Sequence, residues 1–112
     1  MPKNESVSIV PGIESNRAVY QVLDDLGRYG RVWTELGEEE ANEPTVIRWI
    51  IEGQFKRPLR VIAFNTGQEW SRDVTREIAG KLLDLNNMGT ALGAAAREFV
   101  ERTTGQVPTT MV

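Results

Sequence analysis

Two adjacent carboxylates, Asp24 and Asp25, end an apolar run. Their type and spacing make them the first candidates for a metal-binding or catalytic role. Oxygen ligands at the end of a strand can hold Mg²⁺ without histidine or cysteine. The sequence has neither residue type, which excludes thiol nucleophiles, disulfides, imidazole bases and thiolate or imidazole zinc sites. A glycine-containing turn follows directly, and Asp side chains commonly cap the amides of turns. We favour this structural role, with a metal site as the alternative.

A second motif is Gly27-Arg28-Tyr29-Gly30, followed by Arg31. It has the form of the Gly-x-x-Gly loop with which KH domains clamp a nucleic-acid backbone, and its arginines flank an aromatic ring suited to stacking on a base. In KH domains, however, this loop joins two helices, whereas here the flanking patterns are those of strands. The two preceding carboxylates would also repel phosphate. A hairpin turn is the favoured interpretation, and single-stranded RNA binding through Arg28, Tyr29 and Arg31 is the alternative.

A third candidate site follows the apolar run that ends at Phe64. The residues Thr66-Gly67-Gln68-Glu69 match a capping box and predict that a helix begins there. Free amides at such a helix N-terminus bind anions or phosphate groups, and ligands gather outside the carboxyl ends of strands. We therefore predict that a ligand site, if one exists, includes Asn65, Thr66, Trp70 and Arg72.

The length and net charge of the chain limit the kinds of molecule that it is expected to bind. The chain has 112 residues and a formal net charge of -3, so it is sized for one domain and has no overall positive field to attract nucleic acid or anionic lipid. No apolar run approaches the length of a signal peptide or of a bilayer span. The predictions are a cytoplasmic protein that does not contact the membrane, with nucleic acid unfavoured as a partner.

Hydrophobic patterning predicts the elements that position these residues. Residues 17–26 fit either a helix or a strand, and the two-glycine connection to the strand at 31–36 favours a hairpin. Pro44 starts a helix that Gly53 ends, and a strand covers 59–64. Apolar spacing from Trp70 to Leu85 predicts a second helix, and a third runs from about 90 to 102.

This order, ββαβαα, predicts an α+β protein in the form of a small two-layer α/β sandwich, with the hairpin and the 59–64 strand in one sheet and helices on one face. Residues 1–16 are assigned to a flexible arm or edge strand, 17–104 to a single domain and 105–112 to a flexible tail. Such a sheet leaves exposed edges, and pairing an edge or the alanine-rich third helix with a second copy predicts a homodimer.

Several strings resemble a family of short proteobacterial proteins with no established activity. They are Val19-Tyr20-x-Val22-Leu23-Asp24-Asp25-x-Gly27-Arg28-x-Gly30-Arg31-x-Trp33, Glu52-Gly53-Gln54, Arg60-Val61-x-Ala63-Phe64-Asn65-Thr66 and Trp70-Ser71-Arg72-Asp73-Val74. The resemblance implies a compact bacterial cytoplasmic domain and supports the strand at residues 19–23. It carries over no catalytic residue and no cofactor.

Three functions follow as hypotheses. The leading one is a non-enzymatic domain that acts through contacts with an unidentified protein or with itself. The second is a protein or enzyme that binds a divalent metal or a phosphorylated ligand, using Asp24 or Asp25 with Arg31, Asn65, Thr66 and Arg72. The third is the RNA-binding hypothesis. The second hypothesis requires that the loops at 24–33 and 65–73 lie close together, because only then can their residues form a single ligand site.

Overall fold

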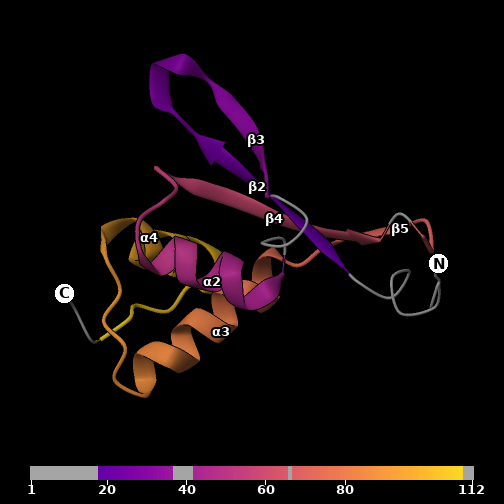
Figure 1. Cartoon of the computed structure of the whole chain (residues 1–112). Helices are drawn as coiled ribbons and strands as arrows, with labels where there is room; N and C mark the ends of the chain where they lie inside the picture. The colour runs from indigo at the N-terminus through magenta and orange to yellow at the C-terminus, as the bar shows by residue number, and fades with distance from the viewer. Residues whose placement is uncertain (1–17, 37–41, 66, 110–112) are drawn as a thin grey trace.

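The structure is a four-stranded sheet with three α-helices on one face (Figure 1). The computed structural model describes residues 18–36, 42–65 and 67–109. Its elements are β2 (Val19–Asp25), the 3₁₀ turn η1 (Gly27–Tyr29), β3 (Arg31–Glu35), α2 (Glu43–Ile51), β4 (Pro58–Asn65), β5 (Trp70–Asp73), α3 (Thr75–Asn87) and α4 (Ala94–Thr104). The predicted α+β class and two-layer arrangement are confirmed, with one strand more than predicted.

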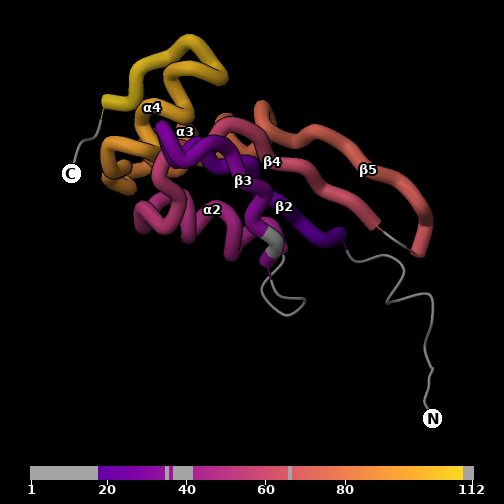
Figure 2. The backbone as a smooth tube through the Cα atoms, turned by 90° about the horizontal axis from the view of Figure 1, so that it is seen from above, coloured from indigo at the N-terminus to yellow at the C-terminus, as the bar shows by residue number. Residues whose placement is uncertain are grey.

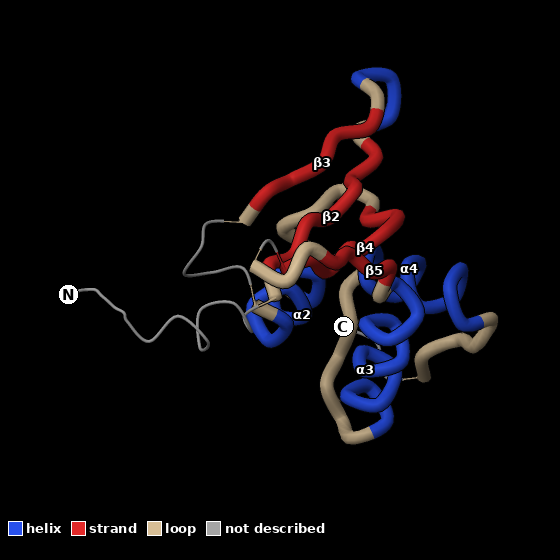
Figure 3. Tube along the Cα trace, turned by 90° about the vertical axis from the view of Figure 1, so that its right-hand side faces the viewer, coloured by secondary structure: helices blue, strands red, loops and turns tan. Residues whose placement is uncertain are grey.

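The sheet has the order β3-β2-β4-β5, and every neighbouring pair is antiparallel. Because β3 and β4 both run antiparallel to β2, they run parallel to each other on its two sides. The connection through α2 therefore crosses over β2 and returns the chain to the same sheet, as predicted. Figure 3 shows the sheet and the helices as two layers, and all three helices of the described residues lie on the same face of the sheet.

Residues 19–26 form a strand and a turn, which settles the choice between helix and hairpin. Val22 and Asp24 are buried, and their neighbours Leu23 and Asp25 are less so, which is the alternation of a strand. The turn needs left-handed backbone at Gly27 (φ 71°) and Gly30 (φ 92°), which favours glycine at both positions. The glycine pair thus sets the hairpin between β2 and β3.

The prediction of a helix from Trp70 to Leu85 is wrong in its first part. Residues 70–73 form β5, which pairs with Ile62 to Asn65 of β4, and α3 begins only at Thr75. The Asp73 carboxylate accepts a hydrogen bond from the main-chain N–H of Thr75 (2.9 Å), the first residue of the helix, and so satisfies one of the amides that the first turn leaves unpaired. Trp70 and Val74 have the spacing of a helix, but pairing of β5 with β4 outweighs this local preference.

The start of α2 agrees with the prediction, whereas that of α4 does not. Asn42 accepts a hydrogen bond from the N–H of Thr45 (3.0 Å) and Pro44 follows, so α2 starts as predicted. The third helix begins at Ala94 rather than near residue 90. After it, Thr109 donates its N–H to the buried side chain of Asn86 (3.0 Å), which holds residues near the C-terminus against α3. Residues 1–17 and 110–112 lie outside the described part.

The core lies between the sheet and the helices. Its fully buried side chains come from β2, β4, all three helices and the connection between α3 and α4, and include Val22, Val46, Ile50, Val61, Ile78, Leu82, Leu92, Phe99 and Val100. The opposite face of the sheet, formed by alternate residues such as Leu23, Ile62 and Phe64, is only half-buried. Within the described residues, no helix is long and apolar enough to cross a membrane.

We predict that Phe99→Ala destabilises the protein by about 3–5 kcal/mol, because it leaves a cavity at the centre of this core. The matched variant Phe64→Ala removes the same ring from the helix-free face and should cost clearly less. Urea unfolding of both variants measures the difference. Equal losses would contradict the placement of the core on the helical face.

Candidate functional site

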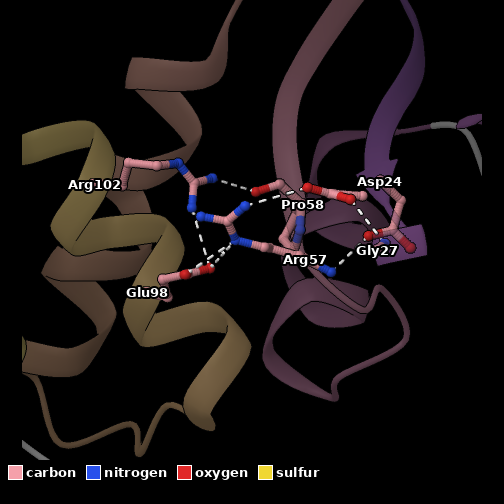
Figure 4. A network of polar contacts seen from close by, with 7 residues as sticks. Asp24, Gly27, Arg57, Pro58, Glu98 and Arg102 are labelled. Atoms are coloured by element: carbon pink, nitrogen blue, oxygen red, sulfur yellow. Dashed lines mark hydrogen bonds and ion pairs between the residues drawn. The ribbon is translucent and has the colours of Figure 1, made fainter. Parts of the chain in front are cut away.

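Asp24 is a buried carboxylate that holds the start of β4 (Figure 4). One of its oxygens accepts the main-chain N–H of Lys56 (3.0 Å), and the other accepts that of Arg57 (2.7 Å). Charge-assisted bonds of this kind offset the cost of burying a carboxylate. Asp24 therefore binds the chain itself, and its oxygens are already engaged.

Asp25 has a similar structural role at the surface. Its Oδ1 accepts the N–H of Gly27 (2.8 Å), and its Oδ2 accepts a hydrogen bond from Nη1 of Arg57 (3.2 Å). The Gly27 amide, together with the guanidinium of Arg57, holds the pKa of this carboxyl below its ordinary value. Asp25 thus has the predicted role in the turn, whereas Asp24 binds amides of a distant loop. Among the described residues, no group of three or more Asp or Glu is placed to hold a metal ion.

Arg57 connects this turn to α4. Its Nε donates to both carboxylate oxygens of Glu98 (3.1 Å each), and Arg102 bonds the same carboxylate from the next turn of the helix (3.2 Å). Hydrogen bonding to Glu98, and then to Asp25, raises the pKa of Arg57. Arg102 also donates to the main-chain oxygen of Pro58. One chain of polar contacts therefore joins β2, β4 and α4 (Figure 4).

The tip of the β2–β3 hairpin projects away from the helices (Figure 1). Tyr29 is 73% exposed, and the guanidinium of Arg28 lies 5.2 Å from the centre of its ring. Arg31 is exposed and stands opposite Asp25 in the strand register. The Gly-x-x-Gly loop joins two strands here, unlike the helix-joining loop of KH domains, so its geometry is that of a hairpin.

The third predicted site lies at the far end of β4. Asn65 is 1% exposed, and its Oδ1 accepts the N–H of Gln68 (2.9 Å) in the turn toward β5. Trp70 donates its indole N–H to Gln68 (3.1 Å), whereas Arg72 is exposed and lies 3.8 Å from Glu77. Thr66 lies outside the described residues. A hairpin turn follows Asn65, so the helix N-terminus predicted to bind an anion is not there.

The two groups of predicted residues do not meet. In the β2–β4 register, Asp24 stands opposite Pro58 and Val19 opposite Phe64, so Asn65 lies at the other end of the strand pair. The strand from Pro58 to Asn65 spans roughly 20 Å. Figure 2 shows the β4–β5 end extending beyond the helices, away from α4. The single ligand site proposed for Asp24 or Asp25 with Asn65 and Arg72 is therefore not assembled.

A cleft that the sequence did not indicate lies beside the start of β4. β5 ends at Asp73, opposite Ile62, so the earlier part of β4 has helix ends in place of a strand neighbour. A β-bulge in the β2–β4 pairing leaves Leu59 without a partner of its own. The cleft has a volume of about 550 Å³ and is lined by Leu23, Arg31, Leu59, Arg60, Asp73, Thr75, Arg76, Arg102 and Thr103. We call it the arginine groove.

Of the predicted site residues, only Arg31 lines the arginine groove. Arg60 could have been assigned to the outward face by strand alternation, because its neighbours Leu59 and Val61 are apolar. Arg76 and Arg102 belong to two different helices, and their approach to β4 depends on tertiary packing. No local pattern in the sequence signals it.

Comparison of the chain with family models, with curated proteins and with solved structures finds no match. The resemblance to short proteobacterial proteins thus stays a prediction. Function has to be argued from the geometry alone.

We predict that Asp24→Asn destabilises the fold by about 2–3 kcal/mol, because the amide replaces one acceptor oxygen with a donor that faces a main-chain N–H. Asp84→Asn, at an exposed position on α3, should change the free energy of unfolding little. Chemical denaturation of the two variants makes the comparison. A loss no greater than that of the Asp84 variant would contradict a structural role for Asp24.

We also predict an acid-sensitive contribution from Asp25. Its pKa is lowered in the folded state from the ordinary 3.8, so the contribution is present above that value and is lost as pH falls through the folded pKa. Asp25→Asn should therefore lower stability at neutral pH and reduce the decline of stability below about pH 4. Thermal melts of both proteins across this pH range test it, and an unchanged acid decline would refute it.

Proposed function

We propose that this protein works through protein contacts, not catalysis, and that it pairs with a second copy of itself along β3. The observation that carries this proposal is the edge position of β3, which has β2 on one side and no strand on the other within the described sheet. Two of its apolar residues, Val32 and Trp33, are 40% and 49% exposed. An exposed apolar edge strand is a template for pairing with another chain.

The hydrogen-bond pattern supports the proposal. Leu26 donates its N–H to the carbonyl oxygen of Gly30 (2.8 Å) and closes the hairpin. From this pair onward, residue pairs that are hydrogen-bonded between β2 and β3 alternate with pairs that are not. Val32 consequently bonds toward β2, and the main-chain groups of Arg31 and Trp33 face outward. These outward groups are available to an antiparallel partner strand.

The sequence of β3 suits a second copy as that partner. Antiparallel pairing centred on Trp33 places this residue opposite itself, Val32 opposite Thr34, and Arg31 opposite Glu35 of the other copy. Aromatic, β-branched and oppositely charged residues are all favourable cross-strand partners. The result is one continuous sheet with the helices of both copies on the same side.

The engaged carboxylates give further support. Asp24, Asp25 and Glu98 bind main-chain amides or guanidinium groups of this chain. A general base needs an oxygen that can reach a substrate proton. Asp24, Asp25 and Glu98 are thus engaged in contacts that hold β2, the start of β4 and α4 together.

We expect the protein to sediment as a dimer and Trp33→Lys to sediment as a monomer, because a lysine on an edge strand opposes pairing with another edge. Tyr29→Lys is the control, since it puts the same charge on the same hairpin but at the exposed tip, away from the β3 edge. Circular dichroism and thermal melts establish that both variants fold.

A second measurement does not depend on any variant. Hydrogen exchange at the amides of Arg31 and Trp33 should slow as protein concentration rises, because pairing occupies these groups. A wild-type protein that remains monomeric up to millimolar concentration would overturn the proposal, as would Trp33→Lys dimers of undiminished affinity.

A further inference from the structure

The arginine groove concentrates positive charge on a protein whose formal net charge is -3. Four arginines line it, Arg31, Arg60, Arg76 and Arg102, and Asp73 is the single acidic residue among the lining residues. Like charges repel when they share a cleft, and counterions or an anionic ligand relieve the repulsion. The local excess of positive charge therefore favours binding of an anion at the groove.

Acidic residues of the described structure neutralise only some of the groove arginines. Arg60 is paired with Asp73 (3.2 Å), and Arg102 is paired with Glu98 and bound to Pro58. Arg31 and Arg76 form no ion pair among the described residues. Within the described part of the chain, the guanidinium groups of Arg31 and Arg76 thus keep hydrogen-bond donors for another partner.

The geometry points to a small molecule with two or more phosphate groups, and we propose that the arginine groove binds one. Guanidinium groups donate paired hydrogen bonds that fit phosphate oxygens, and several of them are needed to balance a polyphosphate. The volume of about 550 Å³ lies within the range of small-molecule sites, and Leu23 and Leu59 add apolar surface. Thr75 and Arg76, the first two residues of α3, also line the groove.

The charges predict opposite effects for two substitutions. Arg76→Ala removes a guanidinium that holds no ion pair in the described structure, so it should weaken binding without disturbing the fold. Asp73→Asn removes the one carboxylate at the groove and releases Arg60, so it should tighten binding. The amide oxygen that this substitution introduces can still accept the Thr75 N–H, which preserves the hydrogen bond at the start of α3.

The experiment is an NMR titration of the full chain at constant ionic strength with inorganic pyrophosphate and, separately, ATP. Localised shifts are expected at Arg60, Asp73, Thr75 and Arg76. Arg76→Ala should raise the dissociation constant about tenfold, and Asp73→Asn should lower it several-fold. Arg48→Ala, an exposed arginine on α2 that pairs only with Glu52 among the described residues, is the matched control and should leave it unchanged.

The two probes separate the sources of the phosphate. Equal affinity for pyrophosphate and ATP identifies the phosphate chain as the part recognised, and tighter binding of ATP adds a contribution from the nucleoside. The proposal is overturned if neither probe shifts these residues, or if Arg48→Ala weakens binding as much as Arg76→Ala. A single-stranded oligonucleotide that binds more tightly than ATP and ignores Arg76→Ala would likewise overturn it in favour of nucleic acid.

This inference and the proposed dimer share one residue, Arg31, which lies on β3 and also lines the groove. The other three groove arginines, Arg60, Arg76 and Arg102, lie on β4, α3 and α4, away from the pairing edge. Sedimentation of Trp33→Lys therefore tests the dimer alone, and titration of Arg76→Ala tests phosphate binding alone.

Discussion

The fold depends on one buried carboxylate. Asp24 lies at the end of β2, and its two oxygens accept main-chain amides from Lys56 and Arg57, more than thirty residues along the chain. A buried carboxylate without such donors would be costly, so the chain must bring that loop to the end of β2. This requirement sets where β4 begins, and it coincides with the bulge that leaves Leu59 unpaired.

The start of β4 in turn sets the position of α4. Once the amide of Arg57 is bound to Asp24, its side chain is directed between Asp25 and Glu98, and Arg102 reaches the oxygen of Pro58 from the same helix. The last turn of α4 is thus fixed beside the first residues of β4. The arginine groove is a consequence, because the helix end that carries Arg102 closes one side of it.

Much of this architecture follows from local signals. The glycines at 27 and 30, and the cap at Asn42 with Pro44, are short-range patterns, and they predicted the hairpin and α2 correctly. β5 was missed because Trp70 and Val74 have helical spacing, and the preference for a strand there comes from pairing with β4. Convergence of Arg60, Arg76 and Arg102 depends on packing among three elements, so no window of the sequence contains it.

The two edges of the sheet differ in a way that bears on how the protein meets its partners. β5 is four residues long, wholly exposed, and includes Arg72 and Asp73, a combination that discourages pairing with another strand. The β3 edge carries Trp33 and Val32, and nothing in the described sheet covers it. Both strands are short and carry two charged residues, so the difference between the edges lies in the exposed apolar residues Val32 and Trp33 at the centre of β3. This asymmetry supports the proposal that contacts between proteins use β3, and it places the proposed phosphate-binding groove beyond the end of β5.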